Sequence, residues 1–599
     1  MKKKLLIPML LILILVLIAG AAEAQDFKYA LSIFHCNIQY VIGGLYGFVF
    51  PPEFVNWDLG PDQTENMIIV QGFKPILDIL QDHPDWTFTV EMQAYYAEVI
   101  AARYPDILQE LKDLVDGGQV ELVSFHYSDQ MFIGFPYQDW KHSIDLTKKT
   151  FADLGLTLSG VVFCQEGEGA EGMATRMAEE GYDVMAWPVN LWRYLHGEPS
   201  EDPYYNFGDV HMIIAAKSIH DTVHGVDVSW TYMDDGELMA AGGIDPYFPW
   251  FFNTKPKAVA EYVAGVQALA DQGYKVSSIG GYVQDMIDAG IPAADPPPLL
   301  DGTWQPDSTD GTSRWFGHRG LWGKDERDNH VRSLNMMAHR EIVAAETAAQ
   351  VAGLDRADVL AEAWRQLIIG ETSDGTGINC FKGEVEFTIA SSAEAFRIAH
   401  DVIDEAKQAL GLDHVLIDSA AGTVIPGDFA WPGAAVAQGP FDVKIKTTKR
   451  TWKTKWFRLE GPPETYRLEI SFSAGADNHA REIYVTFPGN TSDIITTTAL
   501  IDDEVRTWRR ADFTFLSGHW YLPGPIGLFG LGNDWWLVKD MANVHVIARI
   551  EDGSNDLRIE DESAPWFETI TWDFYLMHGT DAQALALADS INVHPTLAR

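Results

Sequence analysis

The pattern of apolar and polar positions from residue 26 to about 290 alternates between two periods. Short apolar runs predict strands, and stretches with apolar residues three and four apart predict helices. The runs occupy 86–92, 119–125, 158–164 and 183–189, and the helical stretches occupy 97–118, 173–181 and 255–274. Because strand and helix alternate, the pattern predicts a parallel sheet in a closed or nearly closed (β/α) barrel. An open doubly wound sheet is the alternative.

The pattern changes after Pro296-Pro297-Pro298. A glycine- and tryptophan-rich stretch precedes amphipathic helices at about 327–352, 355–369 and 391–411, which predict a helical bundle. Residues 420–440 have the composition of a linker, and the short alternating runs beyond them predict a β-sandwich. The expected domains are therefore 25–300, 301–420 and 440–599, in line with a chain too long for one core.

The first predicted strand carries polar side chains at every second position near its end. Alternation places one set of residues on the same side of the strand: Leu31, Ile33, His35, Asn37 and Gln39. This side is apolar at its start and polar at its end, which is typical of the inward face of a barrel strand. An edge strand with one wetted face is the alternative.

The first 24 residues have the features of a signal peptide. Basic Lys2–Lys4 precede an apolar run from Leu5 to Ile18, and Ala22-Glu23-Ala24 supplies small residues for cleavage. The run is shorter than the roughly 20 residues of a membrane-spanning helix. We expect a secreted or periplasmic protein beginning near Gln25, with an uncleaved anchor as the alternative.

Cysteine usage and charge narrow the classes of ligand. Cys36, Cys164 and Cys380 are an odd number without a CxxC pair, so we expect small buried residues rather than disulfides or zinc ligands. The net charge of −43 disfavours nucleic acid and anionic membrane surfaces. The 20 tryptophans suit stacking on sugar rings, although most are expected in the core.

Two acidic stretches follow predicted strands. The first is Cys164-Gln165-Glu166, and the second is Asp234-Asp235-Gly236-Glu237. Hydrolysis of a glycosidic bond needs two carboxyl groups, one to protonate the leaving oxygen and one to attack or to activate water. Acids before helices are also ordinary caps, which is the alternative for each stretch.

Four segments together resemble the motifs of glycoside hydrolase family 57, and the resemblance covers about residues 27–410. They are His35–Gln39, Gly118–Glu121 continuing to His126, Phe163–Glu168 and Asp235–Met239. Asn37 replaces the second histidine of the first motif, and Leu238-Met239 replaces Phe-Gly in the fourth. These departures spare both proposed carboxylates but leave the substrate open.

The resemblance implies a fold and a set of site residues. The fold is an incomplete (β/α)7 barrel whose active site a helical bundle completes. Glu166 would be the nucleophile and Asp235 the general acid and base of a retaining mechanism, with Glu168 and Asp234 as alternatives. No metal or cofactor is required. The implied sugar contacts are His35, Asn37, Gln39, Glu121, His126, Trp304, Trp315 and Asp374.

Three functions fit these observations. The favoured one is an exported glycoside hydrolase or transglycosylase acting on α-linked glucans or related oligosaccharides. Its partner would be an oligosaccharide or polysaccharide, with no nucleic acid and no membrane after signal cleavage. The second is a metal-dependent carbohydrate deacetylase using His35, His126 and either Asp235 or Glu166. The third is a noncatalytic carbohydrate-binding protein on a degenerate hydrolase fold. Oligomeric state is left open.

Overall fold

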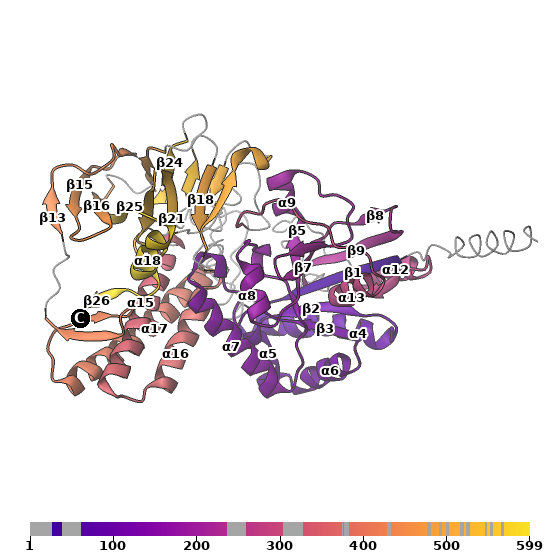
Figure 1. Ribbon diagram of the computed structural model, residues 1–599. Coiled ribbons are helices and arrows are strands. Elements are labelled where there is room, and N and C mark those ends of the chain that lie inside the picture. The colour runs from indigo at the N-terminus through magenta and orange to yellow at the C-terminus, as the bar shows by residue number, and fades with distance from the viewer. Residues whose placement is uncertain are drawn as a thin grey trace, which may run out of the picture.

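The computed structural model divides the chain into an N-terminal α/β region, a helical region and a C-terminal β region (Figure 1). It describes residues 27–38, 61–236, 259–302, 328–373, 375, 382–427, 433–475, 481–489, 494–498, 502, 504–514, 520–522, 527–544, 548–550, 555–564 and 568–599. The expected signal peptide, Gln39, Trp304, Trp315, Asp374 and Cys380 lie outside the described residues.

The strands of the α/β region form two sheets with the orders β3-β2-β1-β9-β8 and β4-β5-β7-β6, and β10 also pairs with β1. Their bounds are β1 Phe27–Cys36, β2 Phe88–Met92, β3 Val120–Val123, β4 Val161–Val162, β5 Val184–Pro188, β6 Tyr205–Phe207, β7 Val210–Ala215, β8 Ile219–Asp221, β9 Val226–Asp235 and β10 Lys275–Ser277. Neighbours are parallel as predicted, except that β6 pairs antiparallel with β7 and β8 with β9. The predicted strand–helix alternation did not indicate these two antiparallel pairs.

Helices follow most of these strands. They are α3 Pro61–Asn66, α4 Lys74–Asp82, α5 Ala94–Arg103, α6 Pro105–Asp116, α7 Tyr137–Leu154, α8 Met173–Glu179, α9 Val189–His196, α12 Val259–Ala270 and α13 Ile279–Asp288, with a π-helical segment at Met67–Phe73. The prediction of one helix over 97–118 was wrong, because the chain breaks at Tyr104. Pro105 explains the break, since proline begins a helix but disrupts the interior of one.

The two faces of β1 meet different cores, as the alternation predicted. Leu31 and Ile33 pack with inward residues of both sheets, including Val161 of β4. Phe34 and Cys36 belong to the core under α4, α5, α6 and α12. His35 and Asn37, at the polar end of the inward face of β1, therefore lie where the strands of both sheets end.

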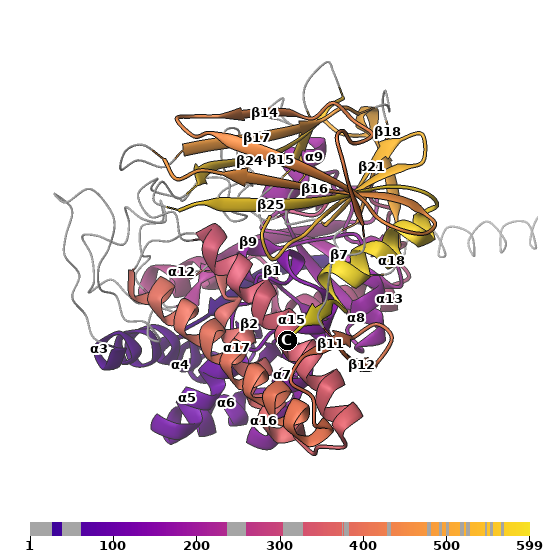
Figure 2. The same cartoon turned by 90° about the vertical axis from the view of Figure 1, so that its left-hand side faces the viewer.

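The helical region packs against the α/β region (Figure 2). Its helices are α15 Asp328–Ala352, α16 Ala357–Gly370 and α17 Lys382–Leu410. The first two agree closely with prediction, whereas α17 begins at Lys382 rather than at 391. Its first turns read KGEVEFT, which has too few apolar positions to display a helical period. None of the helices in the described ranges is long and apolar enough to cross a membrane.

The C-terminal β region contains two antiparallel sheets that share a core, as residues of both belong to one cluster. The first has the order β13-β15-β16-β25-β22-β21-β18-β19 and the second β14-β17-β24-β23-β20. Their bounds are β13 Ala434–Val436, β14 Lys444–Thr447, β15 Trp452–Arg458, β16 Glu464–Phe472, β17 Arg481–Phe487, β18 Ile494–Thr498, β19 Arg506–Arg509, β20 Trp520–Leu522, β21 Leu528–Gly532, β22 Trp535–Lys539, β23 Ala548–Ile550, β24 Leu557–Ala564 and β25 Ile570–His578.

A third, smaller sheet returns the chain to the helical region. In it β11 (Val415–Asp418) pairs with β12 (Thr423–Pro426) and with β26 (Thr596–Ala598), which follows α18 (Asp581–Asn592). The stretch 420–440, which has the composition of a linker, thus contains β12 and β13.

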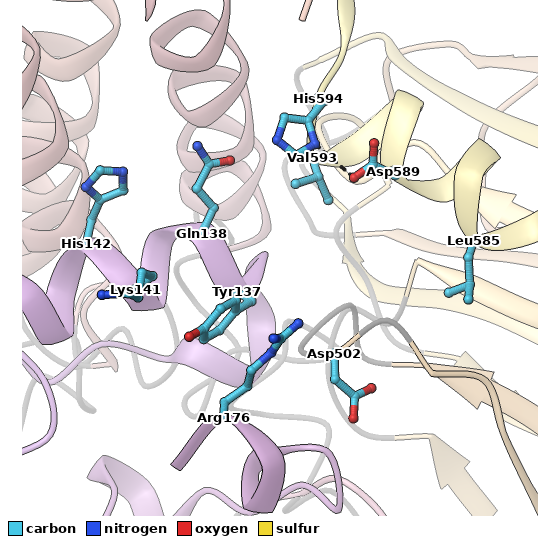
Figure 3. A pocket seen from close by; sticks show the side chains of 10 residues that line it. All are labelled: Tyr137, Gln138, Lys141, His142, Arg176, Asp502, Leu585, Asp589, Val593 and His594. Carbon is cyan, nitrogen blue, oxygen red and sulfur yellow. Dashed lines mark hydrogen bonds and ion pairs between the residues drawn. The ribbon is translucent and has the colours of Figure 1, made fainter. Parts of the chain in front are cut away.

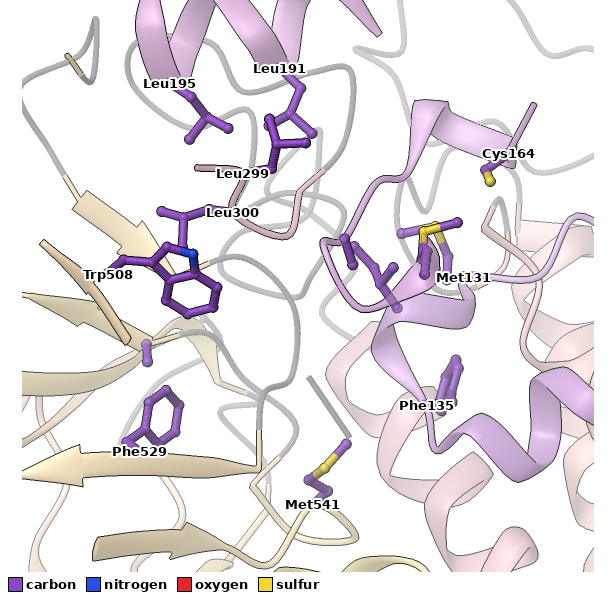
Figure 4. Packing of buried hydrophobic residues seen from close by; sticks show 14 of the residues in the cluster. Met131, Phe135, Cys164, Leu191, Leu195, Leu299, Leu300, Trp508, Phe529 and Met541 are labelled. Carbon is purple, nitrogen blue, oxygen red and sulfur yellow. The ribbon is translucent and has the colours of Figure 1, made fainter. Parts of the chain in front are cut away.

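Buried apolar side chains join the α/β region to the β region (Figure 4). Met131 and Leu299 on one side belong to the same cluster as Trp508, Phe529 and Met541 on the other. The indole nitrogen of Trp508 also donates a hydrogen bond to the Glu171 carboxylate, 3.0 Å away. The β region is therefore packed onto the rest of the protein rather than tethered beside it. Cys36 and Cys164 are both buried, as expected.

Candidate active site

The candidate site lies where the central strands of the α/β region end. The backbone of His35, at the end of β1, is in register with Glu91 of β2 on one side and with Asp235 of β9 on the other. Its ring contacts that of Phe163, which follows β4, with the ring centroids 6.0 Å apart. His35 therefore marks the point at which the two sheets and both predicted carboxylate segments converge.

Glu91 joins two buried histidines. Its carboxylate bonds to Nδ1 of His35 and lies 3.4 Å from Nε2 of His126. Asn37 donates to Nε2 of His35 over 3.4 Å, and the backbone N–H of Asp129 donates to Nδ1 of His126 over 3.1 Å. Each imidazole thus uses one nitrogen as an acceptor and turns its N–H toward Glu91. Burial lowers the pKa of His126 to about 4, so this ring is neutral near pH 7.

Sequence analysis missed Glu91 because it lies inside an apolar run. A usable signal was present, since Thr89, Glu91 and Gln93 alternate as the polar residues of the first strand do. All three are buried, and Gln93 accepts a hydrogen bond from the backbone of Ile38 over 3.3 Å. Polar alternation at the ends of two adjacent parallel strands therefore indicates a shared buried polar cluster.

Glu166 is held in an unusual backbone conformation just after β4. It lies in a short 3₁₀ turn with φ of 55°, and the following Gly167 has φ of 53°. Asp129, in the loop after β3, also has a positive φ of 47°. Non-glycine residues rarely adopt this region, and such strain concentrates at functional sites. Both acids are at least nine-tenths buried.

The segment after α16 contributes residues that sequence analysis did not propose. Ser373 donates from its hydroxyl to Glu166 Oε1 over 3.4 Å, and its backbone N–H donates to the carbonyl of Asp129 over 2.9 Å. The amide of Gln130 donates to Glu371, whose carbonyl accepts from the backbone of Met131. The helical region thus supports both loops that carry the strained acids. No sequence period indicated these long-range contacts.

The carboxyl group of Glu371 is surrounded by protein. Burial is the main cause that raises its pKa well above the ordinary value, and the adjacent Asp139 raises it further. A raised pKa favours the protonated form of Glu371, and a protonated carboxyl group can lie beside Asp139 with less charge repulsion.

Glu121 has a local structural role. Its carboxylate accepts from the Thr89 hydroxyl at 2.9 Å and from the backbone N–H of Gly280 at 3.1 Å. These contacts anchor the first turn of α13 to β3. Burial raises the pKa of Glu121 despite the hydrogen bonds. Its proposed contact with sugar stays a prediction.

The structure describes the side chains of some of the other predicted site residues and only the backbone of Asp235. It places His35, Asn37, His126 and Glu166 in one neighbourhood, and it describes Asp235 through its backbone. Within the described ranges, no group of three or more His, Cys, Asp or Glu side chains is arranged to hold a metal ion. Nε2 of His35 and Nδ1 of His126 are engaged in hydrogen bonds. The deacetylase hypothesis stays a prediction, because the side chain of Asp235, one of its two alternative carboxylate ligands, is not among those that the structure describes.

Comparison with known proteins finds similarity between the chain and carbohydrate-active enzymes. No family model matches it. An alpha-amylase of Pyrococcus abyssi is 24% identical over 139 residues, which are 22% of this chain and 21% of that protein. The chain thus spans about a fifth of the length of this curated relative. An alpha-amylase of Pyrococcus horikoshii is 25% identical over 91 residues, which are 15% of this chain and 14% of that protein.

The solved structure of an alpha-mannosidase from Enterococcus faecalis matches with a TM-score of 0.60 at 9% identity, covering 95% of this chain and 89% of that one. The agreement extends over nearly the whole chain, so the three regions together make a fold found in a glycoside hydrolase. The alpha-amylases matched in sequence and this structural match agree with the predicted resemblance of the chain to glycoside hydrolases.

Proposed function

We propose that this protein is an exported glycoside hydrolase or transglycosylase that acts on α-linked glucans or related oligosaccharides. The proposal includes an incomplete (β/α)7 barrel, a helical bundle that completes the site, and a C-terminal β-sandwich. Glu166 attacks the anomeric carbon, and Asp235 protonates the leaving oxygen and then deprotonates water or an acceptor hydroxyl. The alpha-amylases matched in sequence support an α-glucan as substrate.

The position of His35 between the two acidic segments carries the proposal. Its backbone is paired with Asp235, and its ring contacts Phe163, three residues before Glu166. A retaining mechanism needs two carboxyl groups about 5 to 5.5 Å apart on either side of the scissile bond. Strand ends that converge on one histidine are suited to that arrangement.

The buried polar residues around Glu166 suit the proposed chemistry. Hydrogen-bonding side chains fixed by neighbours can orient sugar hydroxyls without reorganising during the reaction. Glu91, Asn37 and the backbone N–H of Asp129 contact the ring nitrogens of His35 and His126, so both rings are held in fixed positions near Glu166.

Variants of the two acids test the assignment. The purified protein is assayed against maltooligosaccharides, with α-mannosides included because of the alpha-mannosidase fold match. Glu166→Gln and Asp235→Asn should each abolish turnover, and proton NMR of the first product should show retention at the anomeric carbon. Full activity in Glu166→Gln, or an inverted product, would overturn the mechanism.

Neighbouring acids provide matched controls. Glu168→Gln and Asp234→Asn remove the same charges one or two positions away along the chain. If Glu168→Gln abolishes turnover and Glu166→Gln does not, Glu168 is the nucleophile. Export is tested separately by sequencing the N-terminus of the secreted protein, where a start near Gln25 is expected.

A further inference from the structure

A pocket of about 350 Å³ lies between the α/β region and the C-terminal part of the chain (Figure 3). Helices α7 and α8 form one side, and α18 with the residues after it forms the other. Its lining residues are Tyr137, Gln138, Lys141, His142, Arg176, Asp502, Leu585, Asp589, Val593 and His594. Pockets between domains with volumes of roughly 300 to 1,000 Å³ are common ligand sites.

The cations lining the pocket are neutralised by acids beside them. Lys141 bonds to Asp145 and lies 3.3 Å from Glu180. Arg176 pairs with Glu179 at 2.9 Å and covers the ring of Tyr137, with its guanidinium carbon 4.1 Å from the ring centroid. An anionic ligand would have to compete with these carboxylates.

The acids lining the pocket are neutralised in the same way. Asp502 bonds to Arg506 through both of its oxygens. Asp589 lies 2.9 Å from Nδ1 of His594, and this contact is the main cause that raises the pKa of His594. With both signs of charge internally paired, the lining favours a ligand that carries no net charge.

The groups that remain for a ligand are uncharged. The side-chain oxygen Oε1 of Gln138 is buried and accepts no hydrogen bond within the described part of the chain. His142 stacks on Trp364 with ring centroids 4.0 Å apart, and burial lowers its pKa to about 4. Leu585 and Val593 add aliphatic surface. A buried amide oxygen without a donor is costly, so turning the Gln138 side chain to accept from a ligand hydroxyl in the pocket would be favoured.

We propose that this pocket is a second, noncatalytic site for a neutral saccharide. Hydroxyl groups would bond to Gln138 and His142, and the C–H face of the sugar would contact Leu585 and Val593. The saccharide class follows from the lining and does not rest on the roles of Glu166 and Asp235. Because Gln138 precedes Asp139 on α7, a bound sugar would lie on the helix that also contacts the candidate active site.

Binding is measured with full-length Glu166→Gln, so that catalysis does not consume the probes. Maltotriose and mannotriose are titrated by calorimetry, and crystals are soaked with whichever binds. Electron density for the sugar is expected in the pocket. Gln138→Leu in the Glu166→Gln background should weaken sugar binding in the pocket about tenfold, because one buried hydrogen bond is lost. Gln366→Leu, an exposed glutamine on α16, is the matched control and should bind as the parent does.

A second variant acts from the other side of the pocket. Leu585→Arg places a charged side chain in the pocket from α18, so this variant should also abolish sugar binding in the pocket. If Gln138→Leu has a lowered unfolding temperature, Leu585→Arg is used in its place. The proposal is overturned if neither trisaccharide binds, if Gln138→Leu and Leu585→Arg bind as the parent, or if only phosphate occupies the pocket. Residual turnover in Glu166→Gln would instead count against the proposed mechanism and would leave the pocket result standing.

Discussion

His339 on α15 forms a buried hydrogen bond through Nδ1 with the carboxylate of Asp139 on α7. Its other nitrogen donates to the carbonyl oxygen of Val593 over 2.9 Å. Asp139 in turn lies beside Glu371, which bonds to Gln130 in the loop after β3. The three regions of the protein therefore meet through one histidine, close to the candidate active site.

Replacing His339 with leucine should destabilise the protein and reduce turnover. The variant leaves a buried carboxylate and a carbonyl without their donor, and breaking such a buried pair costs about 3 to 5 kcal/mol. Urea unfolding monitored by fluorescence measures the loss. His400→Leu is the control, because the pair of His400 with Glu341 is partly exposed and should contribute less than about 1 kcal/mol. An equal loss of unfolding free energy in the two variants would contradict the proposal that His339 joins the three regions.

Acid should destabilise the protein in part through His126. Its pKa is lowered from 6.5 to about 4, so between these values the unfolded chain binds a proton that the folded chain does not. Stability from this group is complete above pH 6.5 and is lost as the pH falls toward 4, by about 3 kcal/mol.

His126→Gln isolates this contribution. The difference in unfolding free energy between the wild type and this variant should shrink as the pH falls from 7 to 4. The neutral His142 is present in both proteins and cancels in the difference. A difference that does not change with pH would show that His126 is not a buried neutral base.

Glu91→Gln should lower kcat more than it affects folding. The amide has one oxygen acceptor in place of two, so one of His35 and His126 loses its acceptor and reorients. Misplacement of a positioned group by about 1 Å costs on the order of 100-fold in rate. Kinetics on the substrate identified by the oligosaccharide panel test this, with Glu110→Gln on α6 as the control outside the candidate site. Unchanged kcat in Glu91→Gln would refute the positioning role.

Gly169→Ala should destabilise the loop that carries Glu166. A Cβ at this position would lie 2.6 Å from the indole ring of Trp187, which is fully buried and has no room to move. Overpacking of this kind costs about 1 to 3 kcal/mol. Gly265→Ala in α12 is the opposite case, since nothing lies within 4 Å of its Cβ and alanine favours a helix by about 1 kcal/mol. Thermal unfolding of both variants checks the two signs.

The parts of this protein that sequence predicted well are those with a local period. The alternation around His35 identified both faces of β1, and the end of an apolar run identified the turn that holds Glu166. The helices α15 and α16 were also predicted within a few residues, because each displays a regular apolar face.

Features that depend on distant contacts were missed. Glu91 was hidden in a strand buried on both faces, and the roles of Glu371 and His339 come from partners some 240 and 200 positions away. Neither residue differs in local sequence from an ordinary helical surface residue. Only the packing of α15 and α16 against the α/β region gives them their surroundings.

The pairing of β26 with β11 has a consequence for biosynthesis. The helical region cannot complete its small sheet, or the ion pair of Arg599 with Glu341, until residues 596–599 have left the ribosome. The helices of this region therefore lack these contacts until the whole β region has been translated. Chaperone dependence during synthesis, rather than low final stability, is the expected weakness of this architecture.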